Sequence, residues 1–144
     1  MRTHLCARLA GPLVVALALG AGCSLTDAVQ DEQSCPGDDC PPELSQLGDD
    51  VAALPGVTDV ERTAWFSGLD NGVSGRVEVV ATGVDRAEAA EIAASIVDLY
   101  VESDIEEPAV IDVEIATDPD QEFGSGDPYS FWADEGNWSR IQQR

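Results

Sequence analysis

The chain of 144 residues contains no lysine, and its one histidine is His4. The absence of lysine excludes catalysis through a lysine Schiff base. His4 lies in the N-terminal segment, so a protein that loses this segment has no imidazole for a Ser-His-Asp or Cys-His nucleophile or for a zinc ligand. No glycine-rich loop with the spacing of a phosphate-binding motif follows a strand-like segment. Nucleotide chemistry is therefore not expected either, and nothing indicates a cofactor.

Cations are scarce: seven arginines stand against 28 acids, for a formal charge of −21. Such a field repels nucleic-acid phosphates and anionic lipid headgroups. We therefore expect no nucleic-acid partner, and no direct contact between the folded part and anionic lipid.

A long apolar run occurs at the N-terminus, where a basic start precedes residues 9–21. This run has the length of a signal peptide and is too short to span a bilayer comfortably. It ends in Leu-Gly-Ala-Gly-Cys23-Ser, in which small residues leave room for a peptidase. The motif resembles the lipobox of bacterial lipoproteins, with Gly20 in place of the usual large aliphatic residue.

The resemblance implies that residues 1–22 are removed as a signal peptide and that Cys23 receives a diacylglyceryl group, with acyl chains such as palmitate. Two chains on one residue suffice for stable anchoring. Two arginines leave with the leader, so five cations against 28 acids give the mature chain a formal charge of −23. We expect a lipoprotein on the outer, extracytoplasmic face of the cell membrane. The alternatives are a cleaved signal peptide with an incidental cysteine, or a retained transmembrane helix.

Two further cysteines, Cys35 and Cys40, follow in Cys-Pro-Gly-Asp-Asp-Cys. Outside the cytoplasm they should form a disulfide, and we expect it to stiffen the chain locally beside the tether. A redox pair is the alternative, but its usual spacing is CxxC. Residues 23–43 are rich in polar residues, Pro and Gly, and so predict a lipidated acidic stalk with a short disulfide loop.

Residues 44–117 predict an α+β domain. Leucine and valine recur three or four apart over 44–54, as in a short amphipathic helix. Residues 57–66 favour a strand, and Asn71-Gly72 favours a hairpin turn into a return strand over 76–81.

The second half of this domain begins with a capping-box pair, Asp85 and Glu88, ahead of a helix that reaches Tyr100. Alternation over 111–115 predicts a third strand. The order helix, strand, strand, helix, strand favours a small antiparallel or mixed sheet with two helices on one face, the α+β sandwich of ferredoxin-like domains.

Within this domain, residues 77–93 form a strand ending in Gly83 and then a helix rich in alanine and glutamate. Together with the order of elements, this segment is similar to the BON domains of bacterial envelope proteins. Residues 104–108 depart from that family, which usually carries Gly-Val there. The resemblance implies association with the envelope or with phospholipid.

Residues 118–144 predict an acidic linker and an aromatic tail, with five of the eight aromatic residues of the chain. Such a concentration favours a segment that packs over an open sheet face or edge. The alternative is a binding surface that includes Trp132 and Trp138.

Four carboxylates of this region cluster in sequence with two glycines and could offer calcium the hard oxygen ligands that it prefers. They are Asp118, Asp120, Glu122 and Asp127. The segment is not an EF-hand, because Phe123 and Tyr129 occupy the positions of the required glycine and acid. A solvated acidic linker is the alternative.

Carboxylates could also act as a glycosidase pair, for which Asp112 and Glu114 are the candidates. The alternative is that both residues simply lie on the solvent-exposed face of one strand. We therefore expect no enzyme, but a non-catalytic interaction module of the cell envelope with a protein or glycan partner. A calcium or small-ligand binder and a minimal carboxylate-dependent hydrolase are the alternatives.

Overall fold

The computed structural model describes residues 30–68 and 72–144. The predicted leader, Cys23 and the turn residue Asn71 lie outside the described residues. Within the described ranges, no helix has the length and apolar character needed to cross a membrane.

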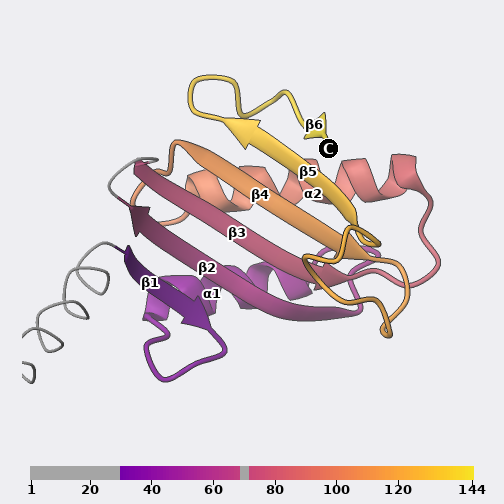
Figure 1. Cartoon of the computed structure of the whole chain (residues 1–144), viewed down its shortest axis with the longest axis horizontal. Helices are drawn as coiled ribbons and strands as arrows, with labels where there is room; N and C mark the ends of the chain where they lie inside the picture. The colour runs from indigo at the N-terminus through magenta and orange to yellow at the C-terminus, as the bar shows by residue number, and fades with distance from the viewer. Residues whose placement is uncertain (1–29, 69–71) are drawn as a thin grey trace, which may run out of the picture.

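A six-stranded mixed sheet and two helices make up the fold. The elements are, in order, β1 (Gln30–Cys35), α1 (Pro42–Ala52), β2 (Asp59–Gly68), β3 (Gly72–Val80), α2 (Arg86–Glu102), β4 (Val110–Ala116), β5 (Tyr129–Asp134) and β6 (Gln142–Gln143). The strands lie side by side in sequence order, and both helices lie behind the sheet in Figure 1. The α+β class is therefore confirmed, but the sheet is larger than the small one predicted, and a ferredoxin-like arrangement is not confirmed.

Helix α2 gives the sheet its parallel pair. Its start is the predicted capping box: the Asp85 side chain accepts hydrogen bonds from the backbone N–H groups of Ala87 and Glu88, and Glu88 accepts one from the N–H of Asp85. Because α2 carries the chain back across the sheet, β3 and β4 pair in parallel, whereas all other neighbouring strands in the described sheet are antiparallel.

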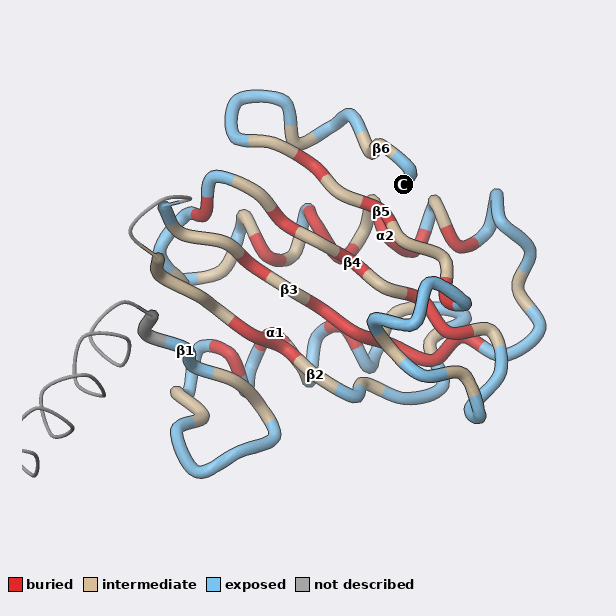
Figure 2. Tube along the Cα trace, viewed as in Figure 1, coloured by how far each residue is buried: buried red, intermediate tan, exposed pale blue. Residues whose placement is uncertain are grey.

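The core lies between the helices and one face of the sheet, where the red buried segments of Figure 2 gather. Alternate residues of β3 and β4, including Val77 and Val113, point into it. The adjacent aromatics of β2 divide between the two faces: Trp65 packs against the core, and Phe66 lies beside arginines on the opposite face. Their adjacency, which interrupts the alternation in sequence, is thus compatible with a regular strand.

Three strands were not predicted. The segment expected to be a stalk contains β1, which pairs with β2 over six residues, and the tail contains β5 and β6. Strand β1 has the polar sequence QDEQSC and joins the sheet at its edge through backbone hydrogen bonds, which require no apolar alternation. Strand β5 does alternate, since Phe131 and Ala133 are buried and their neighbours are not.

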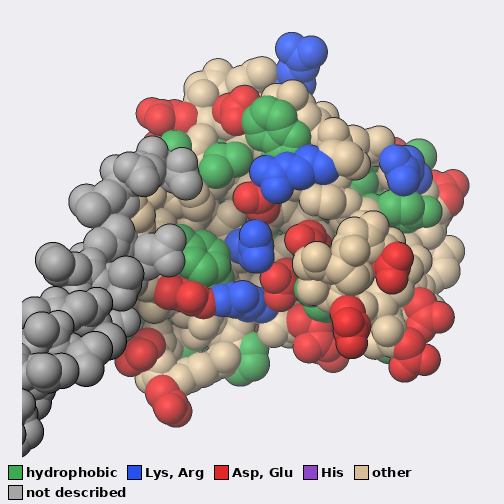
Figure 3. All heavy atoms as spheres, viewed as in Figure 1, with side chains coloured by type: hydrophobic (Ala, Val, Ile, Leu, Met, Phe, Trp, Pro, Cys, Tyr) green, Lys and Arg blue, Asp and Glu red, His purple; other side chains and the backbone are tan. Residues whose placement is uncertain are grey.

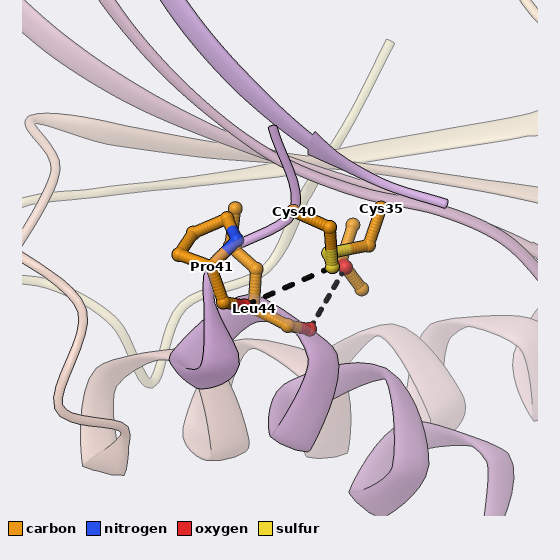
Figure 4. The surroundings of a disulfide bond; sticks show 5 residues. Cys35, Cys40, Pro41 and Leu44 are labelled. Atoms are coloured by element: carbon orange, nitrogen blue, oxygen red, sulfur yellow. Dashed lines mark hydrogen bonds between the residues drawn. A yellow bond between two sulfur atoms is a disulfide. The ribbon is translucent and has the colours of Figure 1, made fainter. Parts of the chain in front are cut away.

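The predicted disulfide between Cys35 and Cys40 is confirmed, with Cα atoms 4.9 Å apart (Figure 4). Cys35 ends β1 and packs against the core, and Cys40 directly precedes Pro41, the N-cap of α1. At the same corner the Thr63 hydroxyl donates to the Leu44 carbonyl oxygen at 3.0 Å. The bond therefore does more than stiffen a stalk, because it ties the edge strand to the start of a core helix.

Replacing both cysteines, Cys35→Ala with Cys40→Ala, should lower the free energy of unfolding by about 2 kcal/mol, because the unfolded chain regains the entropy of a short closed loop. Denaturant unfolding under oxidising conditions measures this change. A reductant should reproduce the loss in the unaltered protein and have no effect on the double variant. Equal unfolding midpoints for the two proteins would refute the stabilising role.

Gly75 leaves room for the side chain of Tyr100 from α2 to lie directly against the sheet. A Cβ atom at this position would lie 2.6 Å from Cζ of Tyr100, a buried residue whose hydroxyl donates to the Ala64 carbonyl oxygen at 3.0 Å. The ring cannot move aside without losing this hydrogen bond, and burial also raises the pKa of Tyr100, which keeps the hydroxyl protonated. The packing of α2 on the sheet thus depends on a glycine in β3.

Gly75→Ala should lower the free energy of unfolding by about 1–3 kcal/mol, the usual cost of overpacking. Gly48→Ala is the matched control, because Gly48 lies in α1 and its added Cβ would meet only Thr63, at 3.8 Å. There the same substitution should stabilise by about 1 kcal/mol through helix propensity. Thermal melting of both variants decides the matter, and shifts of the same sign would contradict this account.

Candidate functional site

The candidate site is the sheet face that points away from the helices, which we name the open face. Within residues 30–68 and 72–144 no helix covers it, and Figure 3 looks directly onto it. Strand alternation sends every second side chain of each strand to this side. The central members are Arg62, Phe66, Arg76, Glu78, Asp112, Glu114, Ser130 and Trp132.

Strand register places all of these side chains except Phe66 in two rows across the sheet. In one row, Arg76 of β3 pairs with Asp112 of β4, which pairs with Trp132 of β5. Neighbouring strands lie about 4.8 Å apart, so side chains in one row are within direct contact distance. This row therefore places a cation, an anion and an aromatic ring side by side.

The second row runs through Arg62, Glu78, Glu114 and Ser130. The loop between β4 and β5 folds over this end of the open face, since the Gly124 N–H donates to a Glu114 carboxylate oxygen at 2.7 Å. The open face is thus closed at one end by its own chain.

Arginines concentrate on the open face, where blue side chains lie among red and green ones in Figure 3. Arg62 forms an ion pair with Glu32, and Arg76 lies 3.8 Å from a Glu78 oxygen. The guanidinium carbons of Arg62 and Arg76 are 5.4 and 5.9 Å from the centre of the Phe66 ring, within cation–π range. Each cation is therefore held between a carboxylate and an aromatic ring.

Glu78 is unusually buried for a carboxylate, with an exposed fraction of 8 %. Burial raises its pKa above the ordinary value of 4.5, and neighbouring Glu114 adds to the rise. Arg62 and Arg76 oppose it without cancelling it. The side chain consequently holds its proton to higher pH than a surface glutamate does.

Asp112 is similar: burial raises its pKa, while Arg144 and Arg76 act in the opposite direction. Its Oδ1 lies 2.8 Å from an Arg144 nitrogen, yet the contact lacks the direction of a hydrogen bond, so charge alone holds the pair. That oxygen is buried from solvent and makes no hydrogen bond within the described residues.

Two depressions meet at this ion pair. The first has a volume of about 420 Å3, and its lining includes Phe66, Arg76 and Asp112. The second, of about 350 Å3, lies around the start of β5 and includes Arg86, Glu114 and Arg144 in its lining. Together they form an elongated, shallow hollow on the open face, and neither depression is a deep enclosed cleft.

Some of the residues predicted from the sequence lie on the open face, and others do not. Trp132 lies on the open face, whereas Trp138 packs against the core and donates its indole N–H to Glu107 at 3.0 Å. The two tryptophans thus have different surroundings. Asp112 and Glu114 do share the open face.

The carboxylates considered for calcium lie exposed in the loop between β4 and β5. Asp118 accepts a hydrogen bond from the Asp120 N–H at 2.9 Å, so part of its capacity serves the local turn. Nowhere in the described ranges are three or more His, Cys, Asp or Glu side chains close enough to hold a metal ion. A calcium site in this loop stays a prediction, without a preformed set of ligands.

Sequence reasoning did not identify Phe66, Arg76 and Glu78 as site residues. Arg76 and Glu78 occupy the polar positions of an alternating strand, which signals only a solvated face. Arg76 and Glu78 lie beside Asp112 and Glu114 because β3 and β4 pair in parallel in this register. The sequence of one strand alone does not predict that register.

Comparison with protein-family models, with curated proteins and with solved structures found no match to this chain. The function is therefore inferred from the open face and from the sequence motifs.

The pH dependence of the free energy of unfolding should reveal the buried carboxyl group of Glu78. A raised pKa means that the folded protein binds this proton more tightly than the unfolded chain, so the contribution of Glu78 is greatest at low pH and falls as pH rises through its pKa. Glu78→Gln removes this fall. The stability of the variant relative to the unaltered protein should therefore increase from about pH 4 to pH 7.

Thermal melting across this range measures the difference. Glu91→Gln is the control, because it removes one exposed charge from α2 and should show little trend. A flat or falling difference for Glu78→Gln would contradict the burial argument.

Proposed function

We propose that this protein is a membrane-anchored, extracytoplasmic lipoprotein whose domain is a non-catalytic interaction module of the cell envelope, with the open face as its contact surface. The observation that carries the contact surface is the gathering of Arg62, Arg76, Phe66 and Trp132 on one uncovered face of the described sheet. The lipobox-like motif that ends in Cys23 supports the anchor.

The chemistry of the open face supports recognition. Arginine and aromatic residues are enriched in the contact centres of protein surfaces, because they combine large apolar area with directional donors. Here three of the five arginines that follow the predicted leader, namely Arg62, Arg76 and Arg144, lie on or beside this face. Their carboxylate partners hold them in place before any ligand arrives.

The length of the tether supports a position near the membrane. Strand β1 begins at Gln30, seven residues after Cys23. A fully extended segment of this length spans at most about 25 Å. The β1 edge would therefore stay close to the bilayer, and the disulfide fixes that edge to the core. Partners would be met at the membrane surface.

The alternatives receive less support. A minimal hydrolase could use the neighbouring Glu78 and Glu114, but these carboxylates lie on the floor of an open face without an enclosed cleft. The ferredoxin-like and BON-like assignments stay predictions, and so does calcium or small-ligand binding. Direct association with anionic phospholipid conflicts with a mature charge of −23.

Mass spectrometry of the membrane fraction tests the anchor. The chain should begin at Cys23 and carry the mass of a diacylglyceryl group, and Cys23→Ser should abolish both the modification and membrane retention. Cys6→Ser is the matched control, because this cysteine belongs to the leader and its loss should change neither property. An unmodified Cys23, or a mature chain that begins elsewhere, would refute the proposed location.

A further inference from the structure

We propose that the open face binds a neutral oligosaccharide, with Trp132 and Phe66 contacting the sugar rings and the Arg76–Asp112 pair bonding to their hydroxyl groups. This inference rests on the proposed function and names the chemical class of its partner.

Charge selects a neutral ligand. The chain as a whole is strongly acidic, at −21, and so repels polyanions. On the open face itself the arginines are matched, since Arg62 contacts Glu32, Arg76 contacts Glu78, and Arg144 contacts Asp112. Because each of these three arginines has a carboxylate beside it, their attraction for an acidic chain is weakened.

The hydrogen-bonding groups suit hydroxyls. A sugar hydroxyl donates one hydrogen bond and accepts others, so a guanidinium beside a carboxylate satisfies both of its functions. Arg76 and Asp112 stand next to each other in register. Asp112 Oδ1 is buried against Arg144, but the Asp112 side chain as a whole keeps 16 % of its surface exposed. These two side chains therefore present a donor and an acceptor side by side.

The aromatic rings lie far enough apart for more than one sugar. Trp132 is on β5 and Phe66 is on β2, three strands away, which corresponds to about 14 Å across the sheet. The first depression reaches from Phe66 to Asp112, the register neighbour of Trp132, and its volume of about 420 Å3 is in the range of small-molecule sites. Aromatic faces pack well against the apolar C–H faces of sugar rings, so two separated rings favour a short chain over a single unit.

The arrangement fits a protein partner less well. Protein contact surfaces have a continuous, largely apolar centre, in which arginine is enriched but aspartate and glutamate are depleted. The centre of the open face instead carries Arg76 and Asp112, with the two rings apart on either side. A second copy of this chain would meet the same obstacle, because it would have to bury these charges.

Isothermal titration calorimetry tests the proposal on the full chain, purified from membranes in a zwitterionic detergent that has no sugar headgroup. The probes are the tetramer of N-acetylglucosamine, maltotetraose and, as an acidic control, trigalacturonic acid. At least one neutral probe should bind, and trigalacturonic acid should bind at least about tenfold more weakly. Trp132→Ala and Phe66→Ala should each weaken binding by about tenfold. Trp138→Phe is the matched control and should leave the affinity unchanged, because Trp138 packs against the core.

Each other outcome overturns the inference. No heat from either neutral probe at millimolar concentration, tighter binding of the acidic probe, or equal affinity in Trp132→Ala would show that the open face does not bind neutral sugars. So would a stable dimer whose contact buries Trp132. Mass analysis of Cys23 in the same sample separates this failure from that of the proposed location, because a lipidated protein without sugar binding refutes the ligand alone.

Discussion

The parallel pairing of β3 with β4 is the constraint on which both the fold and the candidate site depend. It sets Arg76 beside Asp112 and Glu78 beside Glu114, and it exists because α2 returns the chain across the sheet before β4 begins. A shift of one residue in this register would send the same side chains into the core, because alternate residues of a strand face opposite sides. The valines and isoleucines of the two strands, buried against the helices, therefore also fix the charged pairs on the other side.

The one-sided helix layer leaves the open face available. Close contact between α2 and the sheet requires Gly75, above which Tyr100 lies, while the disulfide joins the β1 edge to α1. Buried carboxyls remain on the uncovered side, although burial raises the pKa of Glu78 and of Asp112 and so makes their charged forms costly. Charged groups held at such a cost are commonly found where a protein contacts a ligand.

The sequence allowed prediction of the elements that bury apolar side chains regularly. The capping box at Asp85 marks α2, and alternation marks β4. Strand β1 escaped prediction because an edge strand can be held by backbone hydrogen bonds alone, so QDEQSC resembles a linker. Strand β5 does show alternation, because Phe131 and Ala133 are apolar and buried, but the neighbouring aromatic residues are also apolar and hide this pattern in the sequence. For the site, Trp132 and Asp112 were named from sequence, but their neighbours across the sheet follow from register.

If the open face is the contact surface of an anchored envelope protein, its aromatic side chains should be shielded in the envelope. Hydroxyl-radical footprinting of the protein in intact envelopes and after purification compares directly how accessible each aromatic side chain is. Phe66 and Trp132 should be protected in envelopes and modified in the purified protein, whereas Trp138 should be modified equally in both. Equal modification of Phe66 and Trp132 in the two states would contradict the central claim.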